Sequence, residues 1–136
     1  MDGYRLLIFQ RWLLQGRRDL KAAEVLQKSG AYEWAAFLAQ QAAERVLKAF
    51  LYFHGEESVM GHSIRSLVHK CSSYAAAFEV VHDAGRIDEF YTAPRFPDSF
   101  GEDVPADAIT PEKAEVAVEL ARMVVELVDK LASEEG

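Results

Sequence analysis

Residues 32–53 read YEWAAFLAQQAAERVLKAFLYF, the longest uninterrupted helical pattern in the chain. At about 100° per residue, one broad face carries small or apolar side chains: Ala35, Ala36, Ala39, Ala43, Val46, Leu47 and Phe50. The alanines allow a neighbouring helix to approach closely over the first half. Trp34 and Phe37 fall on the opposite side, so apolar residues nearly surround the helix. A helix of this kind is enclosed by other helices or by a second subunit, and we interpret residues 32–53 as the central helix.

Composition narrows the class of protein. A chain of 136 residues, half of them apolar and 27% charged, predicts a single globular domain over residues 1–136. The formal net charge of −7 argues against a basic sheath around long duplex DNA. The single cysteine, Cys71, excludes an internal disulfide and fits a reducing cytosol. Without a membrane-spanning apolar run or a cleavable signal layout, we expect a cytoplasmic protein that does not associate with membranes.

The central helix is preceded by an amphipathic pattern over residues 4–28. Its apolar stripe is formed by Leu6, Phe9, Leu13, Gly16, Leu20 and Ala23. Four basic residues lie mostly off this stripe and form either a solvated face or a phosphate-contacting patch: Arg11, Arg17, Arg18 and Lys21. Ser29-Gly30 ends the helix, because glycine suits the left-handed position after a helix. The short turn predicts antiparallel packing on the central helix.

Two shorter helices are expected after the central one. Ser63 can cap a helix over residues 64–72. A fourth helix is predicted over residues 74–91, where Gly85 weakens or bends it by roughly 1 kcal/mol relative to alanine.

Residues 92–110 read TAPRFPDSFGEDVPADAIT, with three prolines that cannot sustain a helix. We expect an ordered loop across the bundle, because four side chains could dock it: Arg95, Phe96, Phe100 and Val104. Thr110-Pro111 then starts a last helix that continues to about residue 131, with residues 133–136 fraying. Since no strand-like alternation or internal repeat occurs, the sequence predicts an all-α, up-and-down bundle of about five helices with a long Pro-rich loop before the last one.

Four segments in this order resemble the HEPN domain family, the nucleotide-binding domains of higher eukaryotes and prokaryotes. They are RRDLKAAEVL (17–26), AFLAQQAAERVLKAFL (36–51), HSIRSL (62–67) and IDEFYTAPRFPD (87–98). The similarity is to the small free-standing prokaryotic members and covers about residues 11–131. It implies a helical bundle that usually forms a homodimer, with a cleft for nucleotides or RNA. It also implies a minimal nucleotidyltransferase as protein partner, in a pair of toxin–antitoxin type.

Many members of this family are metal-independent ribonucleases with an arginine followed, after four to six residues, by a histidine. Histidine moves protons near neutral pH, and arginine stabilises charge on a scissile phosphate. No arginine of this chain has a histidine at that spacing; Arg65 and His69 come nearest, with three residues between them. Arg95 stands where the subfamily has Arg, an aromatic residue, Pro and Asp, and no histidine follows it. We therefore expect a non-catalytic domain, with the ribonuclease toxin as the alternative.

Arg95 and Asp98 are the pair singled out in the Pro-rich segment. Prolines on both sides of Arg95 stiffen the backbone and present its side chain either to a phosphate in the cleft or to a nearby acid. In the second case Asp98, Glu44 or Asp88 would pair with Arg95 and hold the loop on the bundle.

His62 precedes the expected third helix, where backbone N–H groups favour an anion. It is either a phosphate-binding or acid–base group, or a loop histidine bonded near the helix start. His54, His69 and His82 show no metal-ligand spacing, so we assign no metal and no cofactor.

Three polar residues of the central helix lie along one stripe: Gln41, Glu44 and Lys48. Glu44 and Lys48 have the favourable order for an i,i+4 ion pair. We expect a buried network, because polar groups inside a bundle need partners; the alternatives are ligands in a cleft or a solvated stripe. Tyr91 and Phe96 could stack on a base, or they could belong to the core.

The leading hypothesis is thus a HEPN-type module that binds nucleotide or RNA phosphates and acts with a nucleotidyltransferase. The candidate binding residues are Arg95, His62, Lys48, Gln41, Glu44, Asp98 and Tyr91. The ribonuclease alternative uses His62 as base and Arg95 as phosphate clamp. A non-enzymatic dimerisation scaffold is the third possibility.

Overall fold

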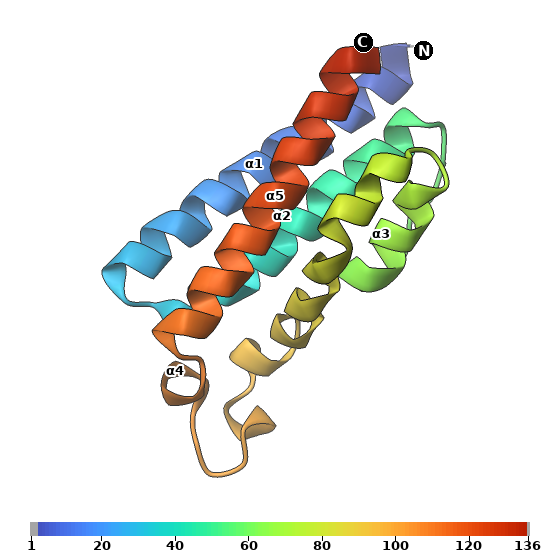
Figure 1. Cartoon of the computed structure of the whole chain (residues 1–136). Helices are drawn as coiled ribbons and strands as arrows, with labels where there is room; N and C mark the ends of the chain where they lie inside the picture. The colour runs from blue at the N-terminus through green and yellow to red at the C-terminus, as the bar shows by residue number, and fades with distance from the viewer. Residues whose placement is uncertain (1–2, 136) are drawn as a thin grey trace.

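The central helix is the axis of the molecule. In the computed structural model, which describes residues 3–135, α2 spans Tyr32–Phe53 as the sequence predicts. Helices α1 (Gly3–Ser29) and α5 (Pro111–Glu135) run along one side of it, and α3 (Ile64–Ser72) and the 3₁₀ segment η1 (Ala76–Phe90) lie on the other (Figure 1). All seven small or apolar residues of the predicted face of α2 are fully buried. The enclosure inferred from the pattern is confirmed.

The all-α prediction is also confirmed. Five helical segments have seven residues or more, and no strand occurs among residues 3–135. The start of α1 and the end of α5 lie together at one end of the bundle (Figure 1). The short segments between η1 and α5 lie at the other end, beside the first turns of α2. No helix in the described part of the chain is long and apolar enough to cross a membrane.

Helix α1 approaches α2 most closely at Gly16. A Cβ atom added there would lie 2.5 Å from Val46 Cγ1 and 3.2 Å from the carbonyl oxygen of Ala42. Both distances are below ordinary van der Waals contact, so only glycine fits without movement. The expected stripe of α1 is buried at Phe9, Leu13, Gly16, Leu20 and Ala23. Leu6 was wrongly placed in it: its side chain is exposed, and it lies in the first turn of α1, at the end of the helix.

The fourth helix differs from the prediction. Residues Ala76–Phe90 wind as a 3₁₀ helix, and the interruption occurs at Val81 (φ −107°, ψ 22°) rather than at Gly85. Gly85 has another role, because a Cβ atom there would lie 3.1 Å from Cβ of Arg65. Its missing side chain lets η1 approach α3, a contact that helical periodicity does not reveal.

The Pro-rich segment is packed, but through other residues than expected. It contains two 3₁₀ turns, η2 (Ala93–Arg95) and η3 (Pro97–Ser99), and the single-turn helix α4 (Pro105–Ala108). Phe96 and Val104, two of the predicted docking residues, are exposed, whereas Phe100 packs against the core. Burial comes instead from Pro94, Pro105 and Ile109. Proline rings and a single isoleucine can enter the core without a longer helix.

The predicted helix boundaries largely hold. Ser63 Oγ accepts a hydrogen bond from the Ser66 N–H, and Thr110 Oγ1 accepts one from the Lys113 N–H. Gly30 has a φ of 88°, as expected for the residue that ends α1. Helix α5 continues to Glu135, four residues beyond the predicted end, so the expected fraying is not seen up to that residue. The ends of the predicted domain, residues 1–2 and 136, lie outside the described residues.

Candidate functional site

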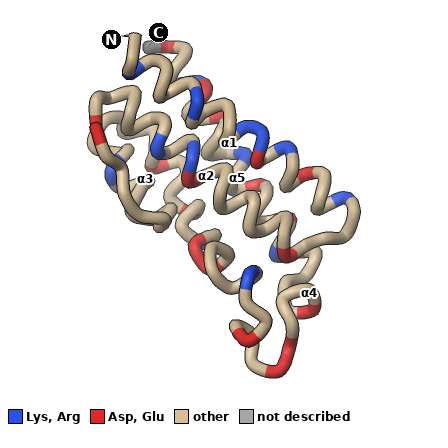
Figure 2. Tube along the Cα trace, turned by 180° about the vertical axis from the view of Figure 1, so that it is seen from behind, with Lys and Arg blue, Asp and Glu red and all other residues tan. Residues whose placement is uncertain are grey.

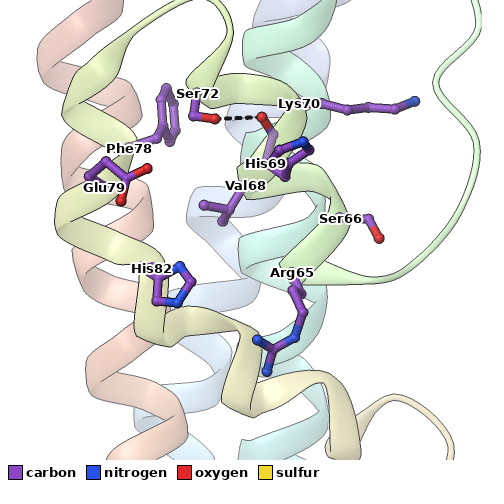
Figure 3. A pocket seen from close by; sticks show the side chains of 9 residues that line it. All are labelled: Arg65, Ser66, Val68, His69, Lys70, Ser72, Phe78, Glu79 and His82. Atoms are coloured by element: carbon purple, nitrogen blue, oxygen red, sulfur yellow. Dashed lines mark hydrogen bonds between the residues drawn. The ribbon is translucent and has the colours of Figure 1, made fainter.

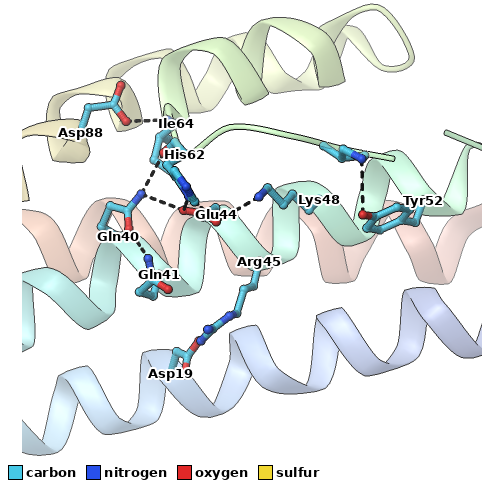
Figure 4. A network of polar contacts seen from close by, with 11 residues as sticks. Asp19, Gln40, Gln41, Glu44, Arg45, Lys48, Tyr52, His62, Ile64 and Asp88 are labelled. Carbon is cyan, nitrogen blue, oxygen red and sulfur yellow. Dashed lines mark hydrogen bonds and ion pairs between the residues drawn. The ribbon is translucent and has the colours of Figure 1, made fainter. Parts of the chain in front are cut away.

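Glu44 is the centre of a buried polar network on α2. Its side chain is 7% exposed and accepts hydrogen bonds from Lys48 Nζ at 3.1 Å and Gln40 Nε2 at 3.3 Å (Figure 4). His62 Nδ1 lies 3.1 and 3.2 Å from the two Glu44 oxygens. One carboxylate therefore connects two successive turns of α2 with the residue that precedes the cap of α3.

The predicted buried network is present. The Lys48 side chain is 7% exposed, and its Nζ lies 5.7 Å from the centre of the Trp12 ring. An ion pair removed from water in this way depends on its partners, since an unpaired buried charge costs several kcal/mol. Lys48 and Glu44 consequently lie beneath His62 and support it, and neither side chain presents a charge to solvent.

Gln40 was missed by the sequence reasoning, which selected Gln41. Gln40 is fully buried, and its Nε2 donates to the His62 carbonyl oxygen at 2.9 Å. Gln41, half-buried, donates to Gln40 Oε1 at 2.7 Å and so only supports its neighbour. The i,i+4 spacing of Gln40 and Glu44 was the available signal.

His62 faces outward from Glu44 and Lys48, and its ring stacks on that of Tyr91. The two ring centroids are 4.2 Å apart, and the planes are inclined by 15°. The His62 side chain is 52% exposed, so the remaining ring nitrogen, Nε2, can be reached by a ligand. Tyr91 is half-buried and joins His62 to the segment that carries Arg95.

Arg95 is held by aromatic rings and one carbonyl oxygen. Its Cζ lies 4.7 Å from the centre of the Tyr91 ring, 5.3 Å from Phe37 and 5.6 Å from Phe96. Its Nε donates to the Tyr91 carbonyl oxygen at 3.0 Å. The ring contacts orient the guanidinium group, and the hydrogen bond to the carbonyl oxygen uses only one of its N–H groups. Most of its N–H groups are therefore directed elsewhere.

No carboxylate within the described residues forms an ion pair with Arg95, including the three acids proposed as partners. Glu44 is engaged by Lys48 and His62, and Asp88 by the start of α3. Asp98 is exposed on η3 and is not brought to Arg95 within ion-pair distance. The segment between η1 and α5 is otherwise acidic, and Arg95 is its one basic residue (Figure 2). The interpretation of Arg95 as a loop anchor paired with an acid is therefore wrong.

Asp88 has a structural role that the sequence did not indicate. Its carboxylate accepts hydrogen bonds from Ser63 Oγ at 3.0 Å, from the Ile64 N–H and from the Arg65 N–H at 3.3 Å. These are the N–H groups at the start of a helix that need partners. The helix terminus beside His62 is consequently already neutralised, and an anion at this site would depend on His62 and Arg95.

A second buried acid, Asp19 on α1, pairs with Arg45 of α2 and accepts a hydrogen bond from Gln15 at 2.9 Å. Arg17, expected either on a solvated face or in a phosphate-contacting patch, is 49% exposed and pairs with Asp129 of α5. These ion pairs connect α1 to its neighbours and lie apart from His62 and Arg95.

The arrangement places two cationic or potentially cationic groups, His62 and Arg95, against one aromatic ring, that of Tyr91. An arginine with unused donors suits a phosphate group, and an imidazole fixed by a carboxylate suits proton transfer or anion binding. Of the predicted site residues, the structure brings together His62, Tyr91 and Arg95 at the surface and Gln41, Glu44 and Lys48 beneath. Asp98 lies apart.

Comparison with known proteins agrees with this fold. The sequence profile of the HEPN domain matches residues 9–131. Three solved structures are similar over 90% of this chain. TT1696 from Thermus thermophilus is 32% identical (TM-score 0.83, 96% of that chain). ST0689, an archaeal HEPN homologue, is 31% identical (0.73, 96%), and a HEPN domain protein from Thermotoga maritima is 25% identical (0.71, 98%). No functionally curated protein matches.

The fold and the matched residues define the class of protein: a helical bundle of HEPN type. This chain belongs to the HEPN domain family.

Proposed function

We propose that this domain binds the phosphate groups of a nucleotide or RNA at His62, Tyr91 and Arg95, without catalysing a reaction. The observation that carries the proposal is Arg95: it has no ion-pair partner in residues 3–135 and is oriented by the Tyr91 ring at 4.7 Å. Because the guanidinium group of Arg95 is held in place without a carboxylate partner, most of its hydrogen-bond donors remain for a ligand. The Tyr91 ring and the exposed Phe96 side chain supply flat surfaces beside it for a base.

Thermal denaturation with a panel of nucleotides and short RNAs tests this function. Ligand at about one hundred times its dissociation constant adds about 2.7 kcal/mol, which raises Tm by several degrees in a domain of this size. Arg95→Ala should abolish the shift without loss of the fold. Arg18→Ala removes an exposed arginine from α1 and should keep the shift. A flat panel for the wild type would contradict nucleotide binding and favour a scaffold.

The proposal includes a cytoplasmic location and a homodimer that acts with a minimal nucleotidyltransferase, in a pair of toxin–antitoxin type. Four exposed apolar residues of α1 support the dimer: Tyr4, Leu7, Leu14 and Val25. They share one face of α1 with Arg11, Arg18 and Lys21, so the proposed contact is a mixed apolar and basic surface. Leu14→Glu should convert the dimer into a monomer in analytical ultracentrifugation, whereas Glu126→Gln on α5 should not. A wild-type monomer at all concentrations would reject the dimer.

A second candidate function, a metal-independent ribonuclease, is favoured by the contact between Glu44 and His62. A histidine oriented by a buried carboxylate is the usual arrangement of a general base, and Arg95 lies across the same Tyr91 ring. Cleavage of labelled RNA in the presence of a chelator, lost in His62→Gln and retained in His82→Gln, is the result that this function requires. Intact RNA after prolonged incubation with the wild type would exclude it.

A further inference from the structure

A pocket outside the proposed site lies between α3 and η1. Its volume is about 430 Å³. Helix α3 contributes Arg65, Val68 and His69 to its lining, and η1 contributes Phe78, Glu79 and His82 (Figure 3). None of His62, Tyr91 and Arg95 lines it, so a ligand here would contact none of the residues of the proposed nucleotide site.

Arg65 is positioned by the close approach of η1. A Cβ atom built on Gly85 would lie 3.1 Å from Arg65 Cβ and 3.3 Å from its Cζ, so the arginine side chain rests directly on the glycine. The nearby carboxylate of Asp88 is occupied by the first N–H groups of α3, including that of Arg65 itself. The Arg65 guanidinium has no ion-pair partner in the described part of the chain and is held at the pocket.

Two histidines complete the basic lining. His69 is four residues after Arg65 and therefore lies on the same face of α3. His82 comes from η1, and Figure 3 shows its ring on the opposite wall, at the same end of the pocket as the Arg65 guanidinium. Lys70 also lines the pocket, but its side chain extends away from it in Figure 3. No group of three or more metal-binding side chains occurs in residues 3–135, so this set of nitrogen donors suits an anion better than a metal ion.

The rest of the lining restricts the other end of the ligand. Glu79 is the one carboxylate among the pocket residues, and it would repel a ligand that is anionic throughout. A carboxylate accepts hydrogen bonds from hydroxyl groups, whereas Val68 and Phe78 offer only apolar atoms. The volume is at the small end of the range for ligand pockets, about 300–1,000 Å³.

We propose that this pocket binds a small phosphate monoester whose organic part carries hydroxyl groups. Arg65 and His82 hold the phosphate, and Glu79 accepts a hydroxyl group of the organic part. His69 lies nearer Ser72 in Figure 3, away from the Arg65 guanidinium, and lines the part of the pocket left for the organic group. Gly85 acts by placing Arg65, without contacting the ligand.

The test uses the imidazole NMR signals of His69 and His82 in the full-length protein, assigned with His69→Gln and His82→Gln. The probes are inorganic phosphate, glycerol phosphate and, as the uncharged comparator, glycerol. The His82 signal should shift saturably with both phosphates, at lower concentration for glycerol phosphate; the His69 signal should shift with glycerol phosphate, and neither signal should shift with glycerol. No saturable shift with either phosphate up to roughly 10 mM would overturn the proposal.

Single variants test which residues in and around this pocket contribute to phosphate binding. Arg65→Ala should weaken phosphate binding about tenfold or more, since it removes charge-assisted hydrogen bonds. Gly85→Ala should weaken it with every charge retained. Arg86→Ala, which removes an exposed arginine of η1 that lines a different groove, should bind as the wild type does. Glu79→Ala, which removes the acceptor, should weaken glycerol phosphate toward the affinity of inorganic phosphate. A preference for glycerol phosphate as large as in the wild type would reject the role given to the hydroxyl group.

Arg95→Ala distinguishes the two sites. It should leave the titrations of His69 and His82 unchanged even if it abolishes the nucleotide-dependent Tm shift. Loss of the histidine shifts in Arg95→Ala, or an unchanged phosphate affinity in folded Arg65→Ala, would overturn the assignment of the phosphate to this pocket.

Discussion

The Tyr91 ring stacks on the His62 imidazole at a centroid distance of 4.2 Å. This contact connects two segments of different origin. His62 is fixed from below by the buried Glu44 of α2, and Tyr91 continues into the turn that carries Arg95. The position of Arg95 therefore depends on a chain of contacts that begins inside the bundle.

Tyr91→Ala should impair ligand binding as Arg95→Ala does. It removes both the stack on His62 and the ring beneath Arg95, contacts of about 0.5–2 kcal/mol each. We expect a several-fold weaker nucleotide affinity in calorimetric titrations. Tyr91→Phe retains the ring and should behave as the wild type; weak binding by Tyr91→Phe would show that the hydroxyl group, not the ring, matters.

Lys48→Met should destabilise the fold strongly. It leaves the Glu44 carboxylate buried without its ammonium partner, at a cost of about 3 kcal/mol. The loss is measured by urea denaturation. The double variant Lys48→Met with Glu44→Gln should recover most of the stability; no recovery would assign the loss to packing.

Asp88→Ala should loosen the start of α3. It removes the acceptor for Ser63 Oγ and for two backbone N–H groups, a loss of about 1–3 kcal/mol. Amide exchange should accelerate first at Ile64 and Arg65, the two N–H groups that lose their acceptor. Asp83→Ala, an exposed acid of the same segment, serves as the control and should exchange as the wild type does.

Gly16→Ala should destabilise the bundle by about 1–3 kcal/mol, because the added methyl group would overlap Val46 Cγ1. Val46→Ala alone leaves a small cavity, but in combination it makes room for the new methyl group. The double variant should accordingly be more stable than the sum of the two single changes, as measured by urea denaturation. Strict additivity would mean that the helices move apart instead.

Cys71 should make stability fall at alkaline pH. The thiol is buried, and burial, followed by the charge of Glu56, raises its pKa well above the ordinary value. Below the ordinary thiol pKa of about 8.5, folded and unfolded chains both keep the proton, and stability does not depend on this group. Above it only the unfolded chain releases the proton, so the free energy of unfolding should fall by about 1.4 kcal/mol per pH unit. Cys71→Ala should lack this slope; an unchanged slope would assign it to another group.

The features that were predicted correctly from the sequence are those that local sequence signals determine. The cap at Ser63, the Thr110-Pro111 start, the glycine after α1 and the buried face of α2 all follow from residues close together in the chain. The 3₁₀ winding of η1 could not be predicted, because it accompanies contacts made across the bundle, by Gly85 under Arg65 and by Asp88 at α3.

For the same reason, the candidate site was predicted only in part. The polarity of Glu44 and Lys48 on an otherwise apolar helix indicated a buried network, and the prolines beside Arg95 drew attention to its turn. The stack of Tyr91 on His62 and the contact of Arg95 with Phe37 join residues that are 29 and 58 positions apart in the sequence. Such pairings depend on how the helices assemble.

The enclosure of α2 has a consequence for mutational surveys of this protein. Most substitutions along that helix should lower abundance, whatever their effect on ligand binding, because nearly every side chain there is surrounded by others. Intolerance to substitution on α2 is thus a measure of folding. The positions at which loss of function at normal abundance would be informative are the exposed ones: His62, Arg65 and Arg95.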